Sequence, residues 1–232
     1  FGLWFEPEMI SVDSELYLTH PEWMICTPHR KPSVGRHQYV LDFTNQEVID
    51  YLFDAISSII QETRLEYIKW DYNRHITDAY TATLSAAKQM EFGHRYILGV
   101  YQLLERLTKA YPEVLFESCS SGGGRFDLGM MYYAPQAWTS DDTDPIERLK
   151  IQHGTSYGYS LSMMSAHVSA SPNEQSGRRT SLDTRAAVAY FGVFGYELDV
   201  NTLEAEEAEK VKEQIDFYKK YREVFQYGNF FR

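Results

Sequence analysis

The chain has 232 residues, of which 44% are hydrophobic, and its 33 acidic and 22 basic side chains leave a formal net charge of −11. No stretch approaches the roughly 20 apolar residues that a membrane-spanning helix requires, which excludes such a helix. The acidic balance, without a basic cluster, argues against binding to the phosphate backbone of nucleic acids. The two cysteines form neither a disulfide framework nor a zinc motif, and we expect no metal and no cofactor.

Short apolar segments alternate along the chain with amphipathic segments of helical period, which is the pattern of β/α units in a parallel sheet. Six strands are predicted, at residues 2–6, 66–70, 114–117, 136–139, 160–167 and 190–200. Helices are predicted from Thr44, around 91–111, from Asp144, and over 203–225. Thr44 and Glu47 have the spacing of a capping box, and Asp144 before Pro145 is typical of a helix N-terminus.

The number of strands indicates the fold class. A closed (β/α)8 barrel has eight strands and takes about 250 residues. We therefore expect an α/β fold, a (β/α)8 TIM barrel that is incomplete at its N-terminus, with about six of the eight strands. Residues 1–232 would form a single partial catalytic domain. A doubly wound sheet is the structural alternative, but no G-x-G-x-x-G turn follows the first strand.

Lys69 and Asp71 lie at the end of the second predicted strand. They are two residues apart, so both side chains point to one face, and the C-terminal strand ends of a barrel carry its active site. A positive Lys69 beside Asp71 would favour the ionised carboxylate. The alternative is an ion pair that is merely buried at a strand end.

A second acidic group follows the fourth predicted strand and contains Asp141, Asp142 and Asp144. Glycoside hydrolysis requires two carboxylates at one site, one to attack the anomeric carbon or activate water and one to protonate the leaving oxygen. An aromatic share of 15% fits a sugar-binding cleft. The alternative is that Asp142 and Asp144 only cap the next helix, which is the role we expect for Asp144. Strand periodicity does not rank Asp141 against Asp142.

Four motifs follow one another in the chain: LWFEPEM from Leu3, KWDYNR from Lys69, ESCSSGGGR from Glu117 and WTSDDTD from Trp138. Their order and spacing resemble the catalytic barrel of the α-galactosidases of glycoside hydrolase family 36, over about residues 1–200. The resemblance implies a retaining glycoside hydrolase that releases terminal α-linked galactose from melibiose or raffinose-type oligosaccharides. It also implies a double displacement through a covalent galactosyl-aspartate intermediate.

The same resemblance implies roles for individual residues. Asp71 matches the nucleophile and Asp141 the acid/base, with Asp142 as the alternative. The residues that match substrate-binding positions are Trp4, Arg36, Lys69, Cys119, Gly122 and Trp138. The alternatives for two of them are core packing of Trp4 and a solvated loop charge at Arg36. The glycine run from Gly122 is either a tight turn close to a ligand or a flexible loop.

The family's barrel begins with strands that are not found in this sequence, one of which ends in an Asp-Asp pair, and its flanking β-rich domains are absent too. Because the sequence starts abruptly at Phe1 and enters a strand at once, we expect a fragment of a longer chain. Alone it would be insoluble or inactive, since unpaired sheet edges invite association. By resemblance, the full-length protein would be a cytoplasmic homo-oligomer of the tetrameric type, acting on α-galactoside oligosaccharides and binding neither nucleic acid nor membrane.

Three other functions remain open from the sequence. A galactosyl transferase of the raffinose-synthase kind would pass the sugar to another sugar rather than to water. A metal-dependent barrel hydrolase is disfavoured because the first strand has no H-x-H pair. A non-catalytic carbohydrate-binding fragment is suggested by the aromatic content alone, and it would not need Lys69, Asp71 and Asp141 at strand ends.

Overall fold

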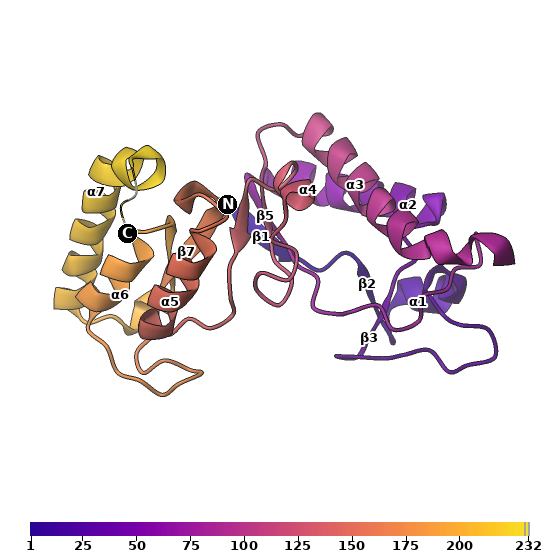
Figure 1. Ribbon diagram of the computed structural model, residues 1–232, viewed down its shortest axis with the longest axis horizontal. Helices are drawn as coiled ribbons and strands as arrows, with labels where there is room; N and C mark the ends of the chain where they lie inside the picture. The colour runs from indigo at the N-terminus through magenta and orange to yellow at the C-terminus, as the bar shows by residue number, and fades with distance from the viewer. Residues whose placement is uncertain (230, 232) are drawn as a thin grey trace. The chain divides into compact units, whose positions relative to one another are not determined.

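A computed structural model describes residues 1–229 and 231 of the chain (Figure 1). The residues fall into two compact units. Unit 1 contains Phe1–Ser121 and Leu128–Ala134, and unit 2 contains Gly122–Asp127 and the described residues from Pro135 onward. Each unit has three parallel strands with helices between them, so the six predicted strands are confirmed. That the chain is one partial catalytic domain stays a prediction.

Unit 1 contains the parallel strands β1 (Gly2–Phe5), β4 (Tyr67–Trp70) and β5 (Leu115–Ser118). Their register places Trp4 opposite Lys69 and Lys69 opposite Glu117. Because side chains alternate between the faces of a sheet, these three residues share one face. Asp71 follows β4 directly, and its backbone N–H donates to the Phe5 carbonyl at 2.8 Å, which ties the end of β4 to β1.

The helices of unit 1 are α2 (Gln46–Thr63) and α3 (Phe92–Ala110), which pack side by side (Figure 1). Their buried stripes include Val48, Leu52, Ile56, Leu103, Leu104 and Leu107. The predicted cap at Thr44 is wrong, because Asn45 caps α2 by accepting from the Glu47 N–H at 3.0 Å. The Thr44 hydroxyl instead donates to Asp42 at 2.6 Å.

The long connection between β1 and α2 contains elements that the sequence pattern did not predict. They are an antiparallel pair, β2 (Met9–Ser11) with β3 (Gln38–Val40), the helix α1 (Glu15–Thr19) and a 3₁₀ turn at Pro21–Trp23. A further 3₁₀ segment, Ala86–Glu91, leads into α3, and the short α4 (Leu128–Met131) also belongs to unit 1. β2 and β3 have three residues each and lie outside the alternation of strands and helices, so no hydrophobic period marked them.

Unit 2 contains the parallel strands β6 (Gln136–Trp138), β7 (Met164–Ser169) and β8 (Val193–Glu197). Its helices are α5 (Pro145–Thr155), α6 (Leu182–Ala189) and α7 (Ala205–Tyr227), with 3₁₀ turns at Leu161–Met163 and Val200–Thr202. The predicted cap of α5 is confirmed, since Asp144 accepts from the Ile146 N–H at 2.8 Å and Pro145 takes the first helical position.

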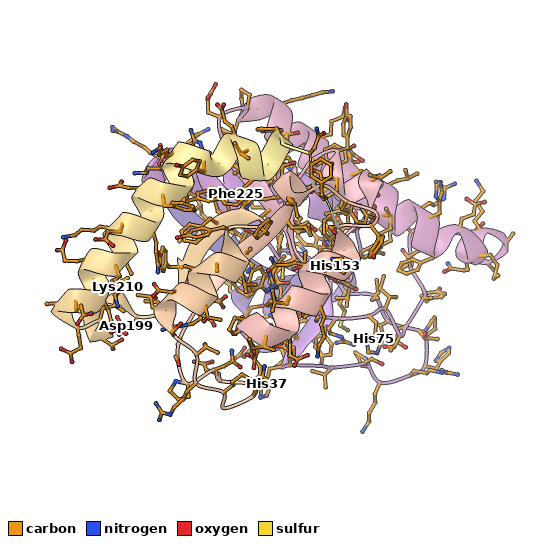
Figure 2. The ribbon with its side chains drawn as sticks, turned by 60° about the vertical axis from the view of Figure 1, so that its left-hand side comes forward. His37, His75, His153, Asp199, Lys210 and Phe225 are labelled. Carbon is orange, nitrogen blue, oxygen red and sulfur yellow. The ribbon has the colours of Figure 1, made fainter. Side chains whose placement is uncertain are left out.

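Aromatic packing fixes α7 in unit 2. Tyr190, which follows α6, lies 5.1 Å from Phe194 and 5.8 Å from Phe225 between ring centres. The Tyr218 hydroxyl donates to the Gly192 carbonyl at 2.7 Å, while Phe225 lies on the last turns of α7 (Figure 2). Much of the high aromatic content of this half therefore serves core packing.

Candidate active site

The Asp71 carboxylate is firmly held at the C-terminal end of β4 in unit 1. The residue is 6% exposed. Its Oδ2 accepts from the Trp4 indole Nε1 at 3.0 Å and from Asn73 Nδ2 at 2.7 Å, and its Oδ1 accepts from the Tyr72 N–H at 2.8 Å. Trp4 is 53% exposed, which excludes the alternative that this residue only packs in the core. Three neutral donors thus fix the direction of the carboxylate.

Lys69 and Glu117 face each other across β4 and β5. The Lys69 ammonium lies 3.7 Å from Glu117 Oε1, and the Tyr67 hydroxyl donates to Oε2 of the same carboxylate. Glu117 is 1% exposed, so its carboxylate is buried on the same face of the sheet as Trp4. Sequence reasoning placed Lys69 beside Asp71 but did not single out Glu117, because the pairing depends on strand register.

Arg36 lies on the long connection of unit 1, where Arg36 and His37 both have positive φ angles, of 53° and 62°. Its Nη1 lies 3.5 Å from Glu6 Oε1, although more than half of the Arg36 side chain is exposed. A hollow of about 390 Å³ is lined by Arg36, Asn73 and other residues of the two loops, including His75, which is labelled in Figure 2. Arg36 is therefore neither buried nor a wholly solvated loop charge.

Asp141 and Asp142 differ in their contacts within unit 2. Asp141 is exposed, and no donor among residues 1–229 and 231 reaches its carboxylate. Only its backbone is held, through the Gln175 Nε2 that donates to the Asp141 carbonyl at 2.8 Å. Oδ1 of Asp142 instead accepts from the Asp144 N–H at 2.9 Å and closes the turn before α5. The freer carboxylate is that of Asp141.

Asp144 has a structural role. Burial acts to raise the pKa of its carboxyl, but the hydrogen bonds from Ser176 and from the Ile146 N–H, together with the Arg178 guanidinium, hold the pKa below its usual value. Arg178 Nη1 lies 3.3 Å from the carboxylate, which is fully buried. The expectation that Asp144 caps a helix is therefore confirmed.

Trp138 lies in a buried group with Arg148 and His167. The indole is 3% exposed, the His167 ring stacks on it at 4.5 Å, and the Arg148 guanidinium lies 4.4 Å from its centre. Arg148 donates to the Ser140 carbonyl at 2.9 Å and to the Ser165 carbonyl at 2.7 Å. Burial lowers the pKa of Arg148 to about 10, which leaves it a cation at neutral pH. The buried indole supports the Asp141 loop, and its predicted substrate contact stays a prediction.

Gly122 and Cys119 belong to the turn after β5. Gly122 has a φ of 80°, and a Cβ at this position would lie 2.7 Å from Ser140 Cα and 3.0 Å from the Asp141 nitrogen. Only glycine allows so close an approach to the Asp141 loop. Cys119 is 4% exposed, and its backbone exchanges hydrogen bonds with Trp70 and Tyr72. The tight turn predicted at Gly122 therefore exists, and it packs against another loop.

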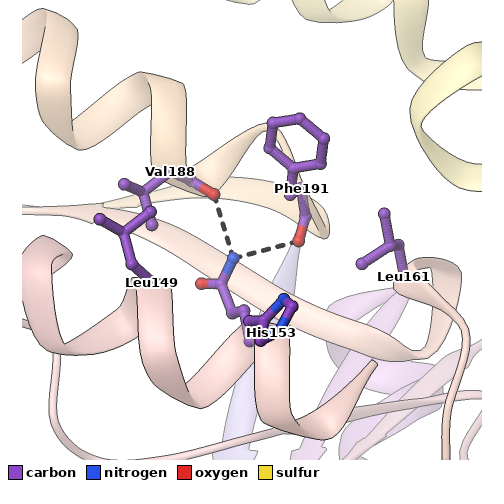
Figure 3. Close-up of a pocket in the computed structure, with 6 residues that line it drawn as sticks. Leu149, His153, Leu161, Val188 and Phe191 are labelled. Carbon is purple, nitrogen blue, oxygen red and sulfur yellow. Dashed lines mark hydrogen bonds between the residues drawn. The ribbon is translucent and has the colours of Figure 1, made fainter. Parts of the chain in front are cut away.

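An apolar hollow of about 280 Å³ lies elsewhere in unit 2 (Figure 3). Leu161, just before β7, and Phe191, just before β8, are part of its lining. Gln152 also lines the hollow, and its Nε2 donates to the Val188 and Phe191 carbonyls at 3.0 and 3.1 Å. The hollow is at the N-terminal ends of the strands, whereas Asp141 follows the C-terminal end of β6, so it is not part of the candidate site.

Residues 1–229 and 231 contain no group of three or more His, Cys, Asp and Glu side chains placed to hold a metal ion. None of the helices in this part of the chain is long and apolar enough to cross a membrane.

The motifs and their geometry correspond to a known family. The model of the melibiase family matches residues 1–228. This chain belongs to the melibiase family. Among curated relatives of this melibiase chain, α-galactosidase 1 of Pediococcus pentosaceus is 52% identical and Mel36A of Lactobacillus acidophilus is 53% identical. Both alignments cover 100% of this chain and 32% of the relative, so the chain spans about a third of their length.

Solved structures confirm the fold class. The melibiase chain superposes on the GH36 α-galactosidase AgaA of Geobacillus stearothermophilus with a TM-score of 0.96 and 51% identity, covering 98% of this chain and 32% of that one. An α-galactosidase from Lactobacillus brevis gives the same TM-score at 63% identity, covering 98% and 31%. The resemblance inferred from the four motifs is therefore confirmed, as is the incomplete α/β barrel.

Proposed function

We propose that the full-length protein is a retaining α-galactosidase that releases terminal α-linked galactose from oligosaccharides of the melibiose and raffinose type. The observation that carries the proposal is the Asp71 carboxylate, buried at the C-terminal end of β4 and held by three neutral donors. A nucleophile needs this combination, since the group must be both ionised and fixed in direction.

The mechanism gives the two carboxylates different tasks. Asp71 attacks the anomeric carbon and forms a galactosyl ester, while the bond to the leaving oxygen breaks and that oxygen takes the proton of Asp141. Asp141 then removes a proton from water, the water oxygen attacks the anomeric carbon, and the ester bond to Asp71 breaks. Two inversions leave galactose with its original α configuration.

Structures of a relative support the assignment of the two residues. Two structures of Geobacillus stearothermophilus AgaA, in complex with raffinose and with stachyose, each have one aspartate replaced besides a shared substitution. The number of positions between the two replaced aspartates of AgaA equals the number between Asp71 and Asp141 in this chain. This equal spacing supports Asp71 as the nucleophile and Asp141 as the acid/base.

The proposal also covers the residues that bind the sugar, the oligomeric state and the cellular location of the full-length protein. The residues proposed to contact substrate or line its site are Trp4, Arg36, Lys69, Cys119, Gly122 and Trp138. The family resemblance supports a cytoplasmic homo-oligomer, which light scattering of the purified full-length protein and cell fractionation would test.

The test of the function is hydrolysis by the full-length protein. Incubation with p-nitrophenyl α-galactoside and with raffinose should release galactose, and proton NMR should show the α anomer first. Asp71→Ala in the same protein is the control and should release none. Initial release of the β anomer would contradict the retaining mechanism, and no release would contradict the function.

A further inference from the structure

Asn73 connects two carboxylates in unit 1. Its Nδ2 lies 2.7 Å from Asp71 Oδ2 and 2.9 Å from Glu6 Oε1. An amide nitrogen has two hydrogens to donate, and each is taken by one carboxylate. Asp71 and Glu6 are therefore joined through one side chain.

The amide of Asn73 has only one acceptable orientation. Its Oδ1 accepts from the Ser121 backbone N–H and from the Ser121 hydroxyl, both at 3.2 Å. A flipped amide would place its oxygen against two carboxylate oxygens and its nitrogen against the Ser121 backbone N–H, losing the bonds to both carboxylates and to that N–H. Asn73 therefore presents a donor to Asp71 in a fixed direction.

Glu6 is itself held in place. Its side chain is 5% exposed and accepts from the Asn73 backbone N–H at 3.2 Å and from Gln38 Nε2 at 3.2 Å. Arg36 Nη1 lies 3.5 Å away and offers the nearby positive charge. A buried carboxylate is tolerated only with such partners, so Glu6 is a rigid anchor for Asn73.

The two oxygens of Asp71 consequently differ. Oδ2 accepts two hydrogen bonds, from Trp4 and Asn73, which use both of its lone pairs. Oδ1 accepts one, from the Tyr72 N–H, and no second donor among residues 1–229 and 231 reaches it. One lone pair of Oδ1 is left to form a bond.

We propose that Glu6 and Asn73 act together as positioning residues that orient the Asp71 carboxylate so that Oδ1 attacks the anomeric carbon. The proposal rests on the function proposed above. Oδ1 forms the ester bond as the leaving oxygen departs with a proton from Asp141, and Oδ2 becomes the ester carbonyl, still facing Trp4 and Asn73. Without Asn73 the carboxylate turns about its Cβ–Cγ bond and meets the sugar at a poor angle.

A double-mutant cycle in the full-length enzyme tests the pairing. Asn73→Ala should lower kcat by about 100-fold, with KM changed less than about 3-fold, because misplacing a reacting group acts on the chemical step. Glu6→Ala should lower kcat by a similar factor. The double variant should lose no more than about 3-fold beyond Asn73→Ala, since Glu6 acts through Asn73. The loss should be equal on p-nitrophenyl α-galactoside and on raffinose.

Folding is monitored by the stoichiometry of 1-deoxygalactonojirimycin binding, because a structure of the relative AgaA holds this compound. It should stay near one per chain in each variant. The isosteric Asn73→Asp keeps the shape of the side chain and should lose at least as much kcat. Glu62→Ala, on the exposed face of α2, is the matched control and should keep the kcat of the wild type.

A crystal structure of the full-length enzyme with a trapped 2-fluoro-galactosyl ester tests the choice of oxygen. The ester carbonyl oxygen should face Asn73 Nδ2, and attachment of the sugar to that oxygen would overturn the proposal. Losses of kcat that multiply in the double variant, or an unchanged kcat in Asn73→Ala, would overturn the positioning role alone. A wild-type enzyme that hydrolyses no α-galactoside would overturn the proposed function, and the positioning role with it.

Discussion

The carboxylates of Asp71 in unit 1 and Asp141 in unit 2 are held in opposite ways. Asp71 is 6% exposed and accepts three hydrogen bonds, two of them at one oxygen. Asp141 is exposed, and it is held through its backbone, by Gln175 at its own carbonyl and by Arg148 at the neighbouring carbonyl of Ser140. Unit 1 fixes the Asp71 carboxylate itself, whereas unit 2 fixes the backbone around the Asp141 carboxylate.

This difference fits the two tasks of a retaining glycosidase. A nucleophile must stay ionised and reach one carbon from one direction, so fixed donors help it. An acid/base must bind a proton, release it and take it up again within each cycle, so permanent donors at its oxygens would hinder it. The contact patterns therefore predict different responses to mutation in the two halves.

The largest effect is expected at Asp71. Asp71→Ala in the full-length enzyme should lower kcat at least about 10⁴-fold on every α-galactoside, because no other group can form the ester. Steady-state rates on p-nitrophenyl α-galactoside and raffinose measure this. A variant that keeps a tenth of the wild-type rate would remove Asp71 from the role of nucleophile.

Asp141 should respond according to the leaving group. Asp141→Asn should lower kcat/KM on raffinose by about 10² to 10⁴-fold, and by much less on p-nitrophenyl α-galactoside, whose phenol leaves without a proton. Asp142→Asn is the matched comparison and should retain most activity, since an asparagine oxygen can still accept from the Asp144 N–H. The reverse ranking on raffinose would make Asp142 the acid/base.

Arg148 should affect both stability and the Asp141 loop. Arg148→Met leaves the Ser140 and Ser165 carbonyls without their buried donor and should destabilise the protein by roughly 3 kcal/mol, besides lowering kcat on raffinose. Lys150→Met, on an exposed position of the same helix, should do neither. Thermal unfolding of the two full-length variants checks this, and equal melting temperatures would refute it.

The smallest effect is a pH dependence at Asp144. Because the folded state holds the pKa of this carboxyl below 3.8, the ionised form adds stability at neutral pH, and this is lost as the pH falls through the lowered pKa. Asp144→Asn keeps an acceptor for Ile146 but loses the charge that faces Arg178, so at pH 7 it should be about 1 kcal/mol less stable.

Urea unfolding of wild type and Asp144→Asn from pH 7 down to about pH 3 measures this difference. The gap between the two proteins should begin to narrow as the pH falls below about 4. A gap that is constant over the whole range would show that the Asp144 charge does not contribute.

Local sequence signals predicted the features that depend on neighbours in the chain. Alternating apolar segments identified the six strands, and Asp144 before Pro145 identified the start of α5. The place of Asp71 directly after β4 also followed from its position behind an apolar run.

Features that depend on distant residues could not be predicted. The pairing of Lys69 with Glu117 follows from strand register, and the link from Glu6 through Asn73 to Asp71 joins residues more than 60 positions apart. Asn45 replaced Thr44 as the cap of α2 because Thr44 is drawn to Asp42. The packing of Gly122 against Ser140 likewise appears only when two loops meet.

The most direct test of the central claim is rescue of the Asp71→Gly variant of the full-length enzyme by azide. The glycine leaves space where the carboxylate was, and a small anion can attack the anomeric carbon from the same side. Azide should restore cleavage of p-nitrophenyl α-galactoside and give a β-galactosyl azide. Absence of rescue, or an α-galactosyl azide, would contradict the assignment of Asp71 as the nucleophile.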